Sequence, residues 1–272
     1  MSKYARILRT SLLLSALAAP CTVLAAPLVT SGSGVDAAAL QSTVDAFRTA
    51  LGGANNGVGG TFTSGRREIN WDGVPDSFSS PNFLPANFFN ANSPRGAVFS
   101  TTFEDGGTGF NSFIVSAKAS TGLPVRFAEI NPTYATSFQT FSAERLFTAR
   151  NSHVIEVQFY VPGTNTPAFV SGFGVVFADV DSSSGIGRSV IRCVDAAGAI
   201  SVAASAPVLD GGLSFVGIRF DQTGEGCARV IIIQGKDSLL PANSDGGAID
   251  VVAMDDFIYG EPQPIFNLVA TP

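Results

Sequence analysis

The sequence has few of the residues on which several common chemistries depend. It contains one histidine, His153, one tryptophan and three cysteines in 272 residues. A zinc site built on several histidines is therefore excluded, as is any mechanism that needs two imidazoles. No Gly-x-Ser-x-Gly segment is present, and no glycine-rich segment completes a Walker or dinucleotide-binding pattern. We therefore predict no catalytic residue from motifs, and no nucleotide site.

Charged residues are also scarce, and their balance is acidic. They make up 14% of the chain, and the formal net charge is −6. Nucleic-acid binding needs a basic surface, so this composition argues against it and against binding to anionic membranes. No apolar segment has the length of a transmembrane helix, so we expect no membrane insertion. Glycine, serine, threonine and asparagine are plentiful, which favours an extracellular β-protein.

The first 25 residues have the pattern of a secretory signal peptide. Lys3, Arg6 and Arg9 precede a short apolar segment, and Val23-Leu24-Ala25 suits a cleavage site after Ala25 or Ala26. Removing this segment takes away three basic residues and no acids, which changes the formal charge from −6 to −9. The sequence therefore predicts a secreted protein.

Two cysteines remain after this processing, Cys193 and Cys227. Both lie in β-type segments, and an even pair in an exported protein favours a disulfide between neighbouring strands or their ends. Two buried free thiols are the alternative.

One helix is predicted near the N-terminus. Apolar residues recur at helical spacing from Ala37 to Leu51, Asp36 occupies an N-cap or first-turn position, and Gly52-Gly53 ends the pattern. A glycine- and asparagine-rich connector follows. We assign residues 1–25 to the signal peptide and 26–60 to the helix and its connector.

The rest of the chain has the alternation and turn signals of a β-domain. In Val154–Val161, Ile155, Val157 and Phe159 alternate with polar residues, which predicts a strand with one buried and one solvated face. Further strands are predicted at Gly172–Asp179, Ser189–Val194, Leu213–Phe220, Arg229–Gln234 and Asp250–Ile258. We predict a mainly β fold, an antiparallel two-sheet jelly-roll-like sandwich over residues 61–262 with one N-terminal helix and a C-terminal tail at 263–272. A barrel is the alternative.

Four carboxylates lie where two apolar strands leave the core. Asp179 and Asp181 end one strand, and Asp255 and Asp256 lie in the last one. Regular alternation puts the first two on one face and separates the second two. If the strands meet, these acids supply the oxygen ligands that calcium prefers. We predict a structural Ca²⁺ site with these four residues as metal ligands, with salt bridges to arginines or turn hydrogen bonds as the alternative.

Four blocks of the sequence resemble those of a known group of proteins. They are RREINWDG at 66–73, NANSPRG at 90–96, SGFGVVFADVD at 171–181 and MDDFIYGEP at 254–262. The blocks are similar to signature segments of an uncharacterised family of secreted bacterial proteins, and the likeness spans nearly the whole mature chain. The late strand that carries Asp255-Asp256 is also similar to one in MAM-like and carbohydrate-binding jelly rolls. That second resemblance implies extracellular recognition or adhesion and, in some such domains, a structural calcium.

These observations together predict a secreted recognition or adhesion module whose partner is an extracellular glycan or a cell surface. Two alternatives stay open. A polysaccharide hydrolase or lyase would use a pair of carboxylates as acid and base. A structural surface or matrix protein would self-associate through its exposed edges. No base or nucleophile accompanies the acids, so an enzyme is the less favoured interpretation.

Overall fold

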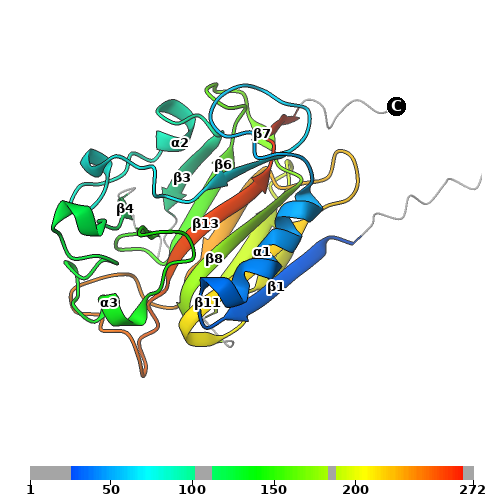
Figure 1. Cartoon of the computed structure of the whole chain (residues 1–272). Helices are drawn as coiled ribbons and strands as arrows, with labels where there is room; N and C mark the ends of the chain where they lie inside the picture. Colours follow the sequence, from blue (N-terminus) through cyan, green and yellow to red (C-terminus); the bar gives the residue numbers. More distant parts are fainter. Residues whose placement is uncertain (1–25, 102–111, 183–187, 266–272) are drawn as a thin grey trace, which may run out of the picture.

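The computed structural model describes residues 26–101, 112–182 and 188–265 (Figure 1). The predicted signal peptide and most of the predicted C-terminal tail lie outside these ranges. Within them the chain is mainly β, with every pairing between named strands antiparallel. The mainly β class and the antiparallel pairing predicted from the sequence are confirmed.

The strands form two large open sheets and one small one. The first sheet has the order β1 (Leu28–Gly34), β11 (Leu209–Arg219), β8 (Gly172–Val180), β13 (Ala253–Gly260), β5 (Phe147–Ala149) and β4 (Phe113–Val115), with β2 (Arg66–Ile69) also paired to β13. The second sheet has the order β10 (Ile200–Ser205), β9 (Val190–Val194), β12 (Arg229–Ile233), β6 (Val154–Phe159) and β3 (Ala97–Thr101). The short strands β7 (Ala168–Phe169) and β14 (Gln263–Pro264) pair with each other.

The main core joins the two large sheets. One contiguous cluster of buried side chains includes Phe173 and Val175 of β8 together with Ile155 and Val157 of β6. Trp71 lies in the same cluster, 1% exposed, with its ring stacked on that of Phe147 at a centroid distance of 3.9 Å. The aromatic residues are thus mainly core, which leaves the strand ends and loops to carry any ligand site.

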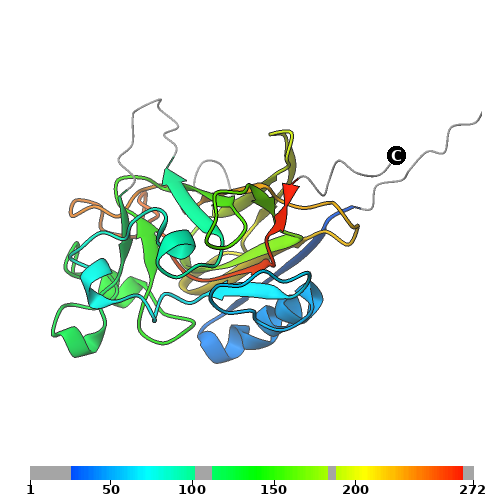
Figure 2. The ribbon, with the colours of Figure 1, turned by 90° about the horizontal axis from the view of Figure 1, so that it is seen from above.

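Helix α1 (Ala37–Leu51) covers the outer face of the first sheet, as Figure 2 shows. Leu40, Val44 and Phe47 are fully buried there, in a second cluster that also contains alternate residues of β8 and β11. Gly217 makes this packing possible, because a Cβ at that position would lie 2.6 Å from the Phe47 ring. The predicted helix and its N-cap are both confirmed, with the Asp36 carboxylate accepting from Ala39 N at 2.8 Å.

Three local features differ from the sequence predictions. The segment assigned to a helix and connector also contributes β1, which pairs with β11. Two four-residue helices, α2 (Phe88–Ala91) and α3 (Tyr134–Ser137), accompany α1, together with the short 3₁₀ turns η1 (Asp76–Phe78) and η2 (Ala119–Thr121). They are too short to leave a periodic signal. The second face of β6 is not solvated, because Glu156 is 7% exposed and pairs with Arg229 across the sheet.

The glycine-rich connector wraps around a buried ion pair. Arg67 is fully buried and donates to both carboxylate oxygens of Glu261, at 2.6 and 2.7 Å. Its remaining donors reach the backbone carbonyls of Gly57, Gly59 and Gly60. Those three glycines have positive φ, which turns their carbonyls onto the guanidinium at little steric cost. The connector therefore holds the buried Arg67 through its backbone carbonyls, although its own residues are exposed or half-buried.

The predicted disulfide is present. Cys193 in β9 and Cys227, two residues before β12, are joined with a Cα–Cα distance of 5.1 Å. The bond lies near the end of the sandwich at which β8 begins and β13 finishes. The opposite end collects the last residues of β8, the first residues of β11 and the connection from β12 to β13.

Candidate functional site

Five carboxylates gather at the end of the sandwich where β8 finishes. One oxygen each from Asp179, Asp181 and Asp210 lie within 4.8 Å of one another, and the same holds for Asp181, Asp245 and Asp250. The first two come from the end of β8 and the residue after it, Asp210 from the start of β11, and the last two from the β12–β13 connection. Asp181 belongs to both groups, so the five acids form one cluster, here called the carboxylate cluster.

A break in strand register aims Asp179 into this cluster. Leu209 pairs with Val180 and Leu213 with Ala178, so β11 carries extra residues opposite Asp179. Asp179 itself has a φ of 70°, a left-handed conformation that is uncommon outside glycine. The backbone N–H of Gly211 donates to Asp179 Oδ1 at 2.7 Å and holds the side chain in place. Strained backbone of this kind is concentrated at functional sites.

Asp250 is the most unusual member of the carboxylate cluster. It is 6% exposed, and neither of its carboxylate oxygens has a side-chain partner in the described part of the chain; the backbone N–H of Asp181 is the one nearby group that lowers its pKa. Its backbone is well held, with its carbonyl accepting from Lys236 N and Asp237 N at 3.0 Å each. Burying an unpartnered carboxylate is costly unless a counter-charge is supplied. The loop therefore presents a buried anionic ligand that the protein itself leaves unsatisfied.

The other buried acids show how this protein normally satisfies such a group. Glu156, Asp256 and Glu261 each pair with an arginine, and Asp255 accepts three hydrogen bonds. By contrast, no arginine or lysine in the described ranges pairs with any member of the carboxylate cluster. Among the described residues, the lack of a basic partner distinguishes this cluster from the other buried acids.

Electrostatic effects in the carboxylate cluster favour protons when no cation is present. Burial raises the pKa of Asp179 to about 8, and the neighbouring Asp245 adds to the rise. Burial likewise raises the pKa of Asp250 to about 7, with the charges of Asp181 and Asp245 acting in the same direction. The pKa of Asp181 rises to about 6 for the same reasons, burial first and then Asp245 and Asp210. A bound cation would offset both the desolvation and the charge repulsion that raise these pKa values.

Asp255 and Asp256 lie in a different environment from Asp179 and Asp181. Met254 pairs with Phe177 and Phe257 with Val175, so the two acids form a bulge in β13. Asp255 accepts from the backbone N–H groups of Phe141 and Ser142 and from Ser142 Oγ, while Asp256 Oδ2 lies 2.9 Å from Arg48 Nη2. The prediction that Asp255 and Asp256 point to opposite faces holds only for a regular strand, and the bulge makes β13 irregular at this point.

The pair formed by Asp255 and Asp256 has a structural explanation. Burial raises the pKa of Asp255 well above its usual value, and the adjacent Asp256 charge adds to this effect. Asp256 forms a salt bridge, the kind of contact that the sequence left open as an alternative, but its partner is Arg48 of α1 rather than an arginine in a strand. The structure thus brings Asp179 and Asp181 together and gives Asp255 and Asp256 other partners.

Three members of the carboxylate cluster were missed from the sequence. Asp210 and Asp245 each begin an Asp-Gly-Gly segment, which is a turn signal, and Asp250 precedes an apolar strand. Asp245 does act locally, since Asp245 Oδ1 accepts from Val251 N at 3.1 Å. Turns that begin with aspartate recur in a sequence in which a strand already ends in aspartates. This recurrence was the signal that could have located the missed residues.

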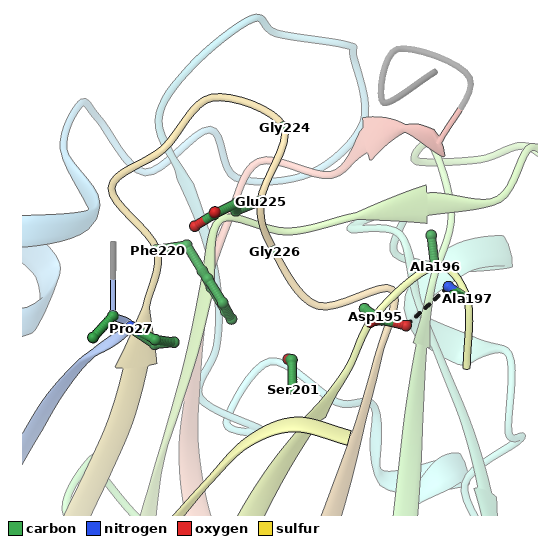
Figure 3. A pocket seen from close by; sticks show the side chains of 10 residues that line it. Pro27, Asp195, Ala196, Ala197, Ser201, Phe220, Gly224, Glu225 and Gly226 are labelled. Atoms are coloured by element: carbon green, nitrogen blue, oxygen red, sulfur yellow. Dashed lines mark hydrogen bonds between the residues drawn. The ribbon is translucent and has the colours of Figure 1, made fainter. Parts of the chain in front are cut away.

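The opposite end of the sandwich carries surface clefts. The cleft in Figure 3 has a volume of about 550 Å³ and is lined by Pro27, Phe220, Asp195 and Glu225, among others. The Asp195 carboxylate accepts from the backbone N–H groups of Ala197 and Ala199, both at 2.9 Å, so this acid closes its own turn. The cleft therefore combines apolar and acidic lining residues.

Two further clefts continue from the first one. The second, of about 240 Å³, shares Asp195 and Ala196 with the first. The third, of about 570 Å³, shares Tyr160 and Pro167 with the second. The third cleft also presents the exposed amide side chains of Asn87 and Asn165. Each cleft thus shares lining residues with its neighbour, and the three together are here called the linked clefts.

Comparison with known proteins assigns no family: no family model matches the chain, and searches of the curated proteins and of the solved structures find no match. None of the helices in the described ranges is long and apolar enough to cross a membrane. The molecule is thus defined by its own features, an antiparallel β-protein with a disulfide, a carboxylate cluster at one end and the linked clefts at the other.

Proposed function

We propose that the protein is a secreted recognition module, a β-sandwich of jelly-roll type that holds calcium in its carboxylate cluster. The observation that carries this proposal is Asp250, whose buried carboxylate has no side-chain or cationic partner in the described residues and faces Asp181 and Asp245. The chain crosses repeatedly between the two large sheets from β8 to β13, with β9 and β10 paired in the second sheet, and these crossings support the jelly-roll assignment. The disulfide supports secretion, because such bonds persist in oxidising compartments.

Calcium is the cation that the ligand set fits best. All five side chains offer hard carboxylate oxygens, with no histidine or cysteine among them, which disfavours zinc and softer metals. Calcium accepts six to eight oxygens in irregular arrangements, whereas magnesium demands near-octahedral geometry and keeps more water. Ligands contributed by a strand end, a bulge and a long connection make an irregular arrangement. The cation would tie these three segments together.

Carbohydrate is the ligand class that the linked clefts fit. Exposed amides such as those of Asn87 and Asn165 donate and accept hydrogen bonds, as sugar hydroxyls require. Tyr160, between two of the clefts, combines a flat apolar face with a polar group, which suits stacking on a sugar ring. The length of the linked clefts favours an extended chain of sugars over a single small molecule.

Hydrolysis of such a chain is a second candidate function, favoured by the presence of Asp195 and Glu225 in one cleft. Binding without turnover is the better-supported interpretation. The Asp195 carboxylate already accepts two hydrogen bonds from the backbone of its own turn. In addition, no member of the carboxylate cluster lines any of the linked clefts. Incubation with polysaccharides and analysis of reducing ends would separate the two, because release of new ends that Glu225→Gln abolishes would establish an enzyme.

Calcium binding is tested by thermal unfolding of the mature protein in chelator and in calcium. We expect calcium to raise the unfolding midpoint of the wild type and to have much less effect on Asp250→Asn. Asp221→Asn is the matched control, since it removes the same charge from an exposed acid outside the cluster. Equal midpoints in chelator and in calcium for the wild type would contradict the proposal.

Carbohydrate binding is tested on glycan arrays with calcium-loaded protein. We expect binding to selected oligosaccharides that weakens at least tenfold in Tyr160→Ala and Asn165→Ala. Gln41→Ala, an exposed amide on α1 outside the linked clefts, serves as the control and should bind as the wild type does. Absence of binding by folded, calcium-loaded protein across a broad array would refute a carbohydrate ligand.

A further inference from the structure

The carboxylate cluster has the geometry of two adjoining sites rather than one. Asp179, Asp181 and Asp210 form one triad of oxygens within 4.8 Å of one another, and Asp181, Asp245 and Asp250 form a second. Asp181 is the common member. A carboxylate has two oxygens and about four lone-pair positions, so one side chain can serve two cations.

Each triad has its own buried acid with unused oxygens. Asp179, 1% exposed, uses Oδ1 to accept from Gly211 N, while Oδ2 has no partner among the described residues. Asp250 leaves both oxygens without one in the same part of the chain. A single cation beside Asp250 would satisfy that residue and leave the Asp179 oxygen in the other triad unsatisfied. Each triad therefore contains a buried acid with an oxygen that accepts no hydrogen bond from a donor group, although Asp179 also lies beside Asp245 of the other triad.

The charge of the carboxylate cluster also matches two cations. Its five carboxylates carry a charge of −5 when all are ionised. One divalent cation would leave −3 in a partly buried volume, whereas two would leave −1, which is much closer to neutrality. No basic side chain in the described ranges pairs with these acids, so the protein supplies no other compensation there.

We propose that the carboxylate cluster binds two divalent cations, calcium in the native protein, with the Asp181 carboxylate bridging them. One cation lies between Asp179 and Asp210, and the other lies between Asp245 and Asp250. This inference rests on the proposed calcium binding and extends it, because the single site of the proposed function becomes a pair. The acids do not supply a full shell for two calcium ions, so water and backbone carbonyls complete it.

The two cations have different structural consequences. The ion at Asp179 and Asp210 links the end of β8 to the start of β11, across the break in their register. The ion at Asp245 and Asp250 joins the β12–β13 connection to the residue that follows β8. Asp210 is exposed whereas Asp250 is buried, so the first ion is the more accessible to solvent. We expect it to exchange faster and to bind more weakly.

The number of ions bound per chain tests this proposal directly. Isothermal titration with calcium, checked by metal analysis after gel filtration, should give two ions for the wild type. Asp210→Asn and Asp250→Asn should each give one, because each removes a ligand of only one ion. Asp181→Asn should weaken both sites at least tenfold, and Asp221→Asn should retain two. The near-ultraviolet circular dichroism of Trp71 verifies that each variant is folded.

The possible outcomes separate the pair from the underlying proposal. A count of one for the wild type would overturn the two-ion site and leave calcium binding intact. A count of zero would remove both proposals together. Retention of two ions by Asp210→Asn would overturn the assignment of its triad. A second measurement uses europium and neodymium in place of calcium: quenching of europium luminescence at mixed loading requires two neighbouring ions, and unquenched emission would contradict them.

Discussion

Replacement of Asp250 by asparagine should stabilise the cation-free protein and destabilise the calcium-loaded one. Asparagine keeps the shape of the side chain but cannot ionise, and its amide can donate to the neighbouring Asp181 and Asp245 carboxylates. In chelator the change removes a buried, unpartnered charge. In calcium the same change removes a ligand. The sign of the effect should therefore depend on the cation.

The pH dependence of this effect follows from the raised pKa. Without a cation, burial and then the charges of Asp181 and Asp245 raise the pKa of Asp250 to about 7 in the folded protein, from 3.8. The folded state thus holds this proton more tightly than the unfolded chain does. The stability contributed by the protonated group is fully present below about pH 4 and is lost as the pH rises through about 7. Asp250→Asn should therefore have little effect near pH 4 and its full effect near pH 8.

The expected magnitude is a few kcal/mol. An unsatisfied buried polar group costs roughly 1–3 kcal/mol, and more when charged, although the exposed side of the carboxylate cluster at Asp210 allows some solvent screening. Since about 1 kcal/mol shifts the midpoint of a protein of this size by roughly 2–4 °C, the variant should melt roughly 2–12 °C above the wild type in chelator at pH 8. At a calcium concentration of about 100 times Kd, the one ion that the variant loses is worth about 2.7 kcal/mol to the wild type, which offsets the variant's advantage and reverses the order wherever that advantage is smaller.

Thermal and urea unfolding in chelator and in calcium, at pH 4.5 and pH 8, measure all four conditions. Asp221→Asn should follow the wild type throughout, because its side chain is exposed outside the cluster. If Asp250→Asn were destabilising in chelator at pH 8, Asp250 would have a protein partner that satisfies it, and the inference of an unsatisfied ligand would be refuted.

Three further predictions concern the scaffold. Replacing Cys193 and Cys227 together by alanine should cost about 3–4 kcal/mol in urea unfolding, from the entropy of a loop of 34 residues, and an equal midpoint would show that the bond does not constrain the unfolded chain. Glu261→Gln should cost about 3–5 kcal/mol by the same assay because it leaves the fully buried Arg67 without its charged partner, whereas a loss below about 1 kcal/mol would show that the glycine carbonyls suffice. Asp36→Ala should cost about 1 kcal/mol through loss of the N-cap of α1, with Asp36→Asn close to the wild type as its control.

Local sequence patterns predicted the elements whose structure depends on near neighbours. The spacing of apolar residues located α1, and Asp36 marked its start. Alternation located β6, and apolar β-type segments located β8, β9 and β12, within a residue or two at most ends. The strand β1 left no such signal, because its serines, threonine and glycines carry no alternation and its place depends on pairing with β11.

The acidic strand ends illustrate the limit of these local patterns. Alternation treats Asp255 and Asp256 as residues of a regular strand, but the bulge in β13 changes the register at that point. The arginine that reaches Asp256 is 208 residues away along the chain. No local pattern contains either fact, because both depend on how distant segments pack.

The sequence by itself determined the β class, the first helix, the disulfide partners and the presence of acids at the end of β8. Each follows from periodicity, composition or a small set of candidate residues. Only the tertiary structure decided which acids meet. The break in register between β8 and β11 and the path of the β12–β13 connection bring Asp210, Asp245 and Asp250 to Asp179 and Asp181. Electrostatic coupling depends on distance in space, and these distances are set by long-range packing.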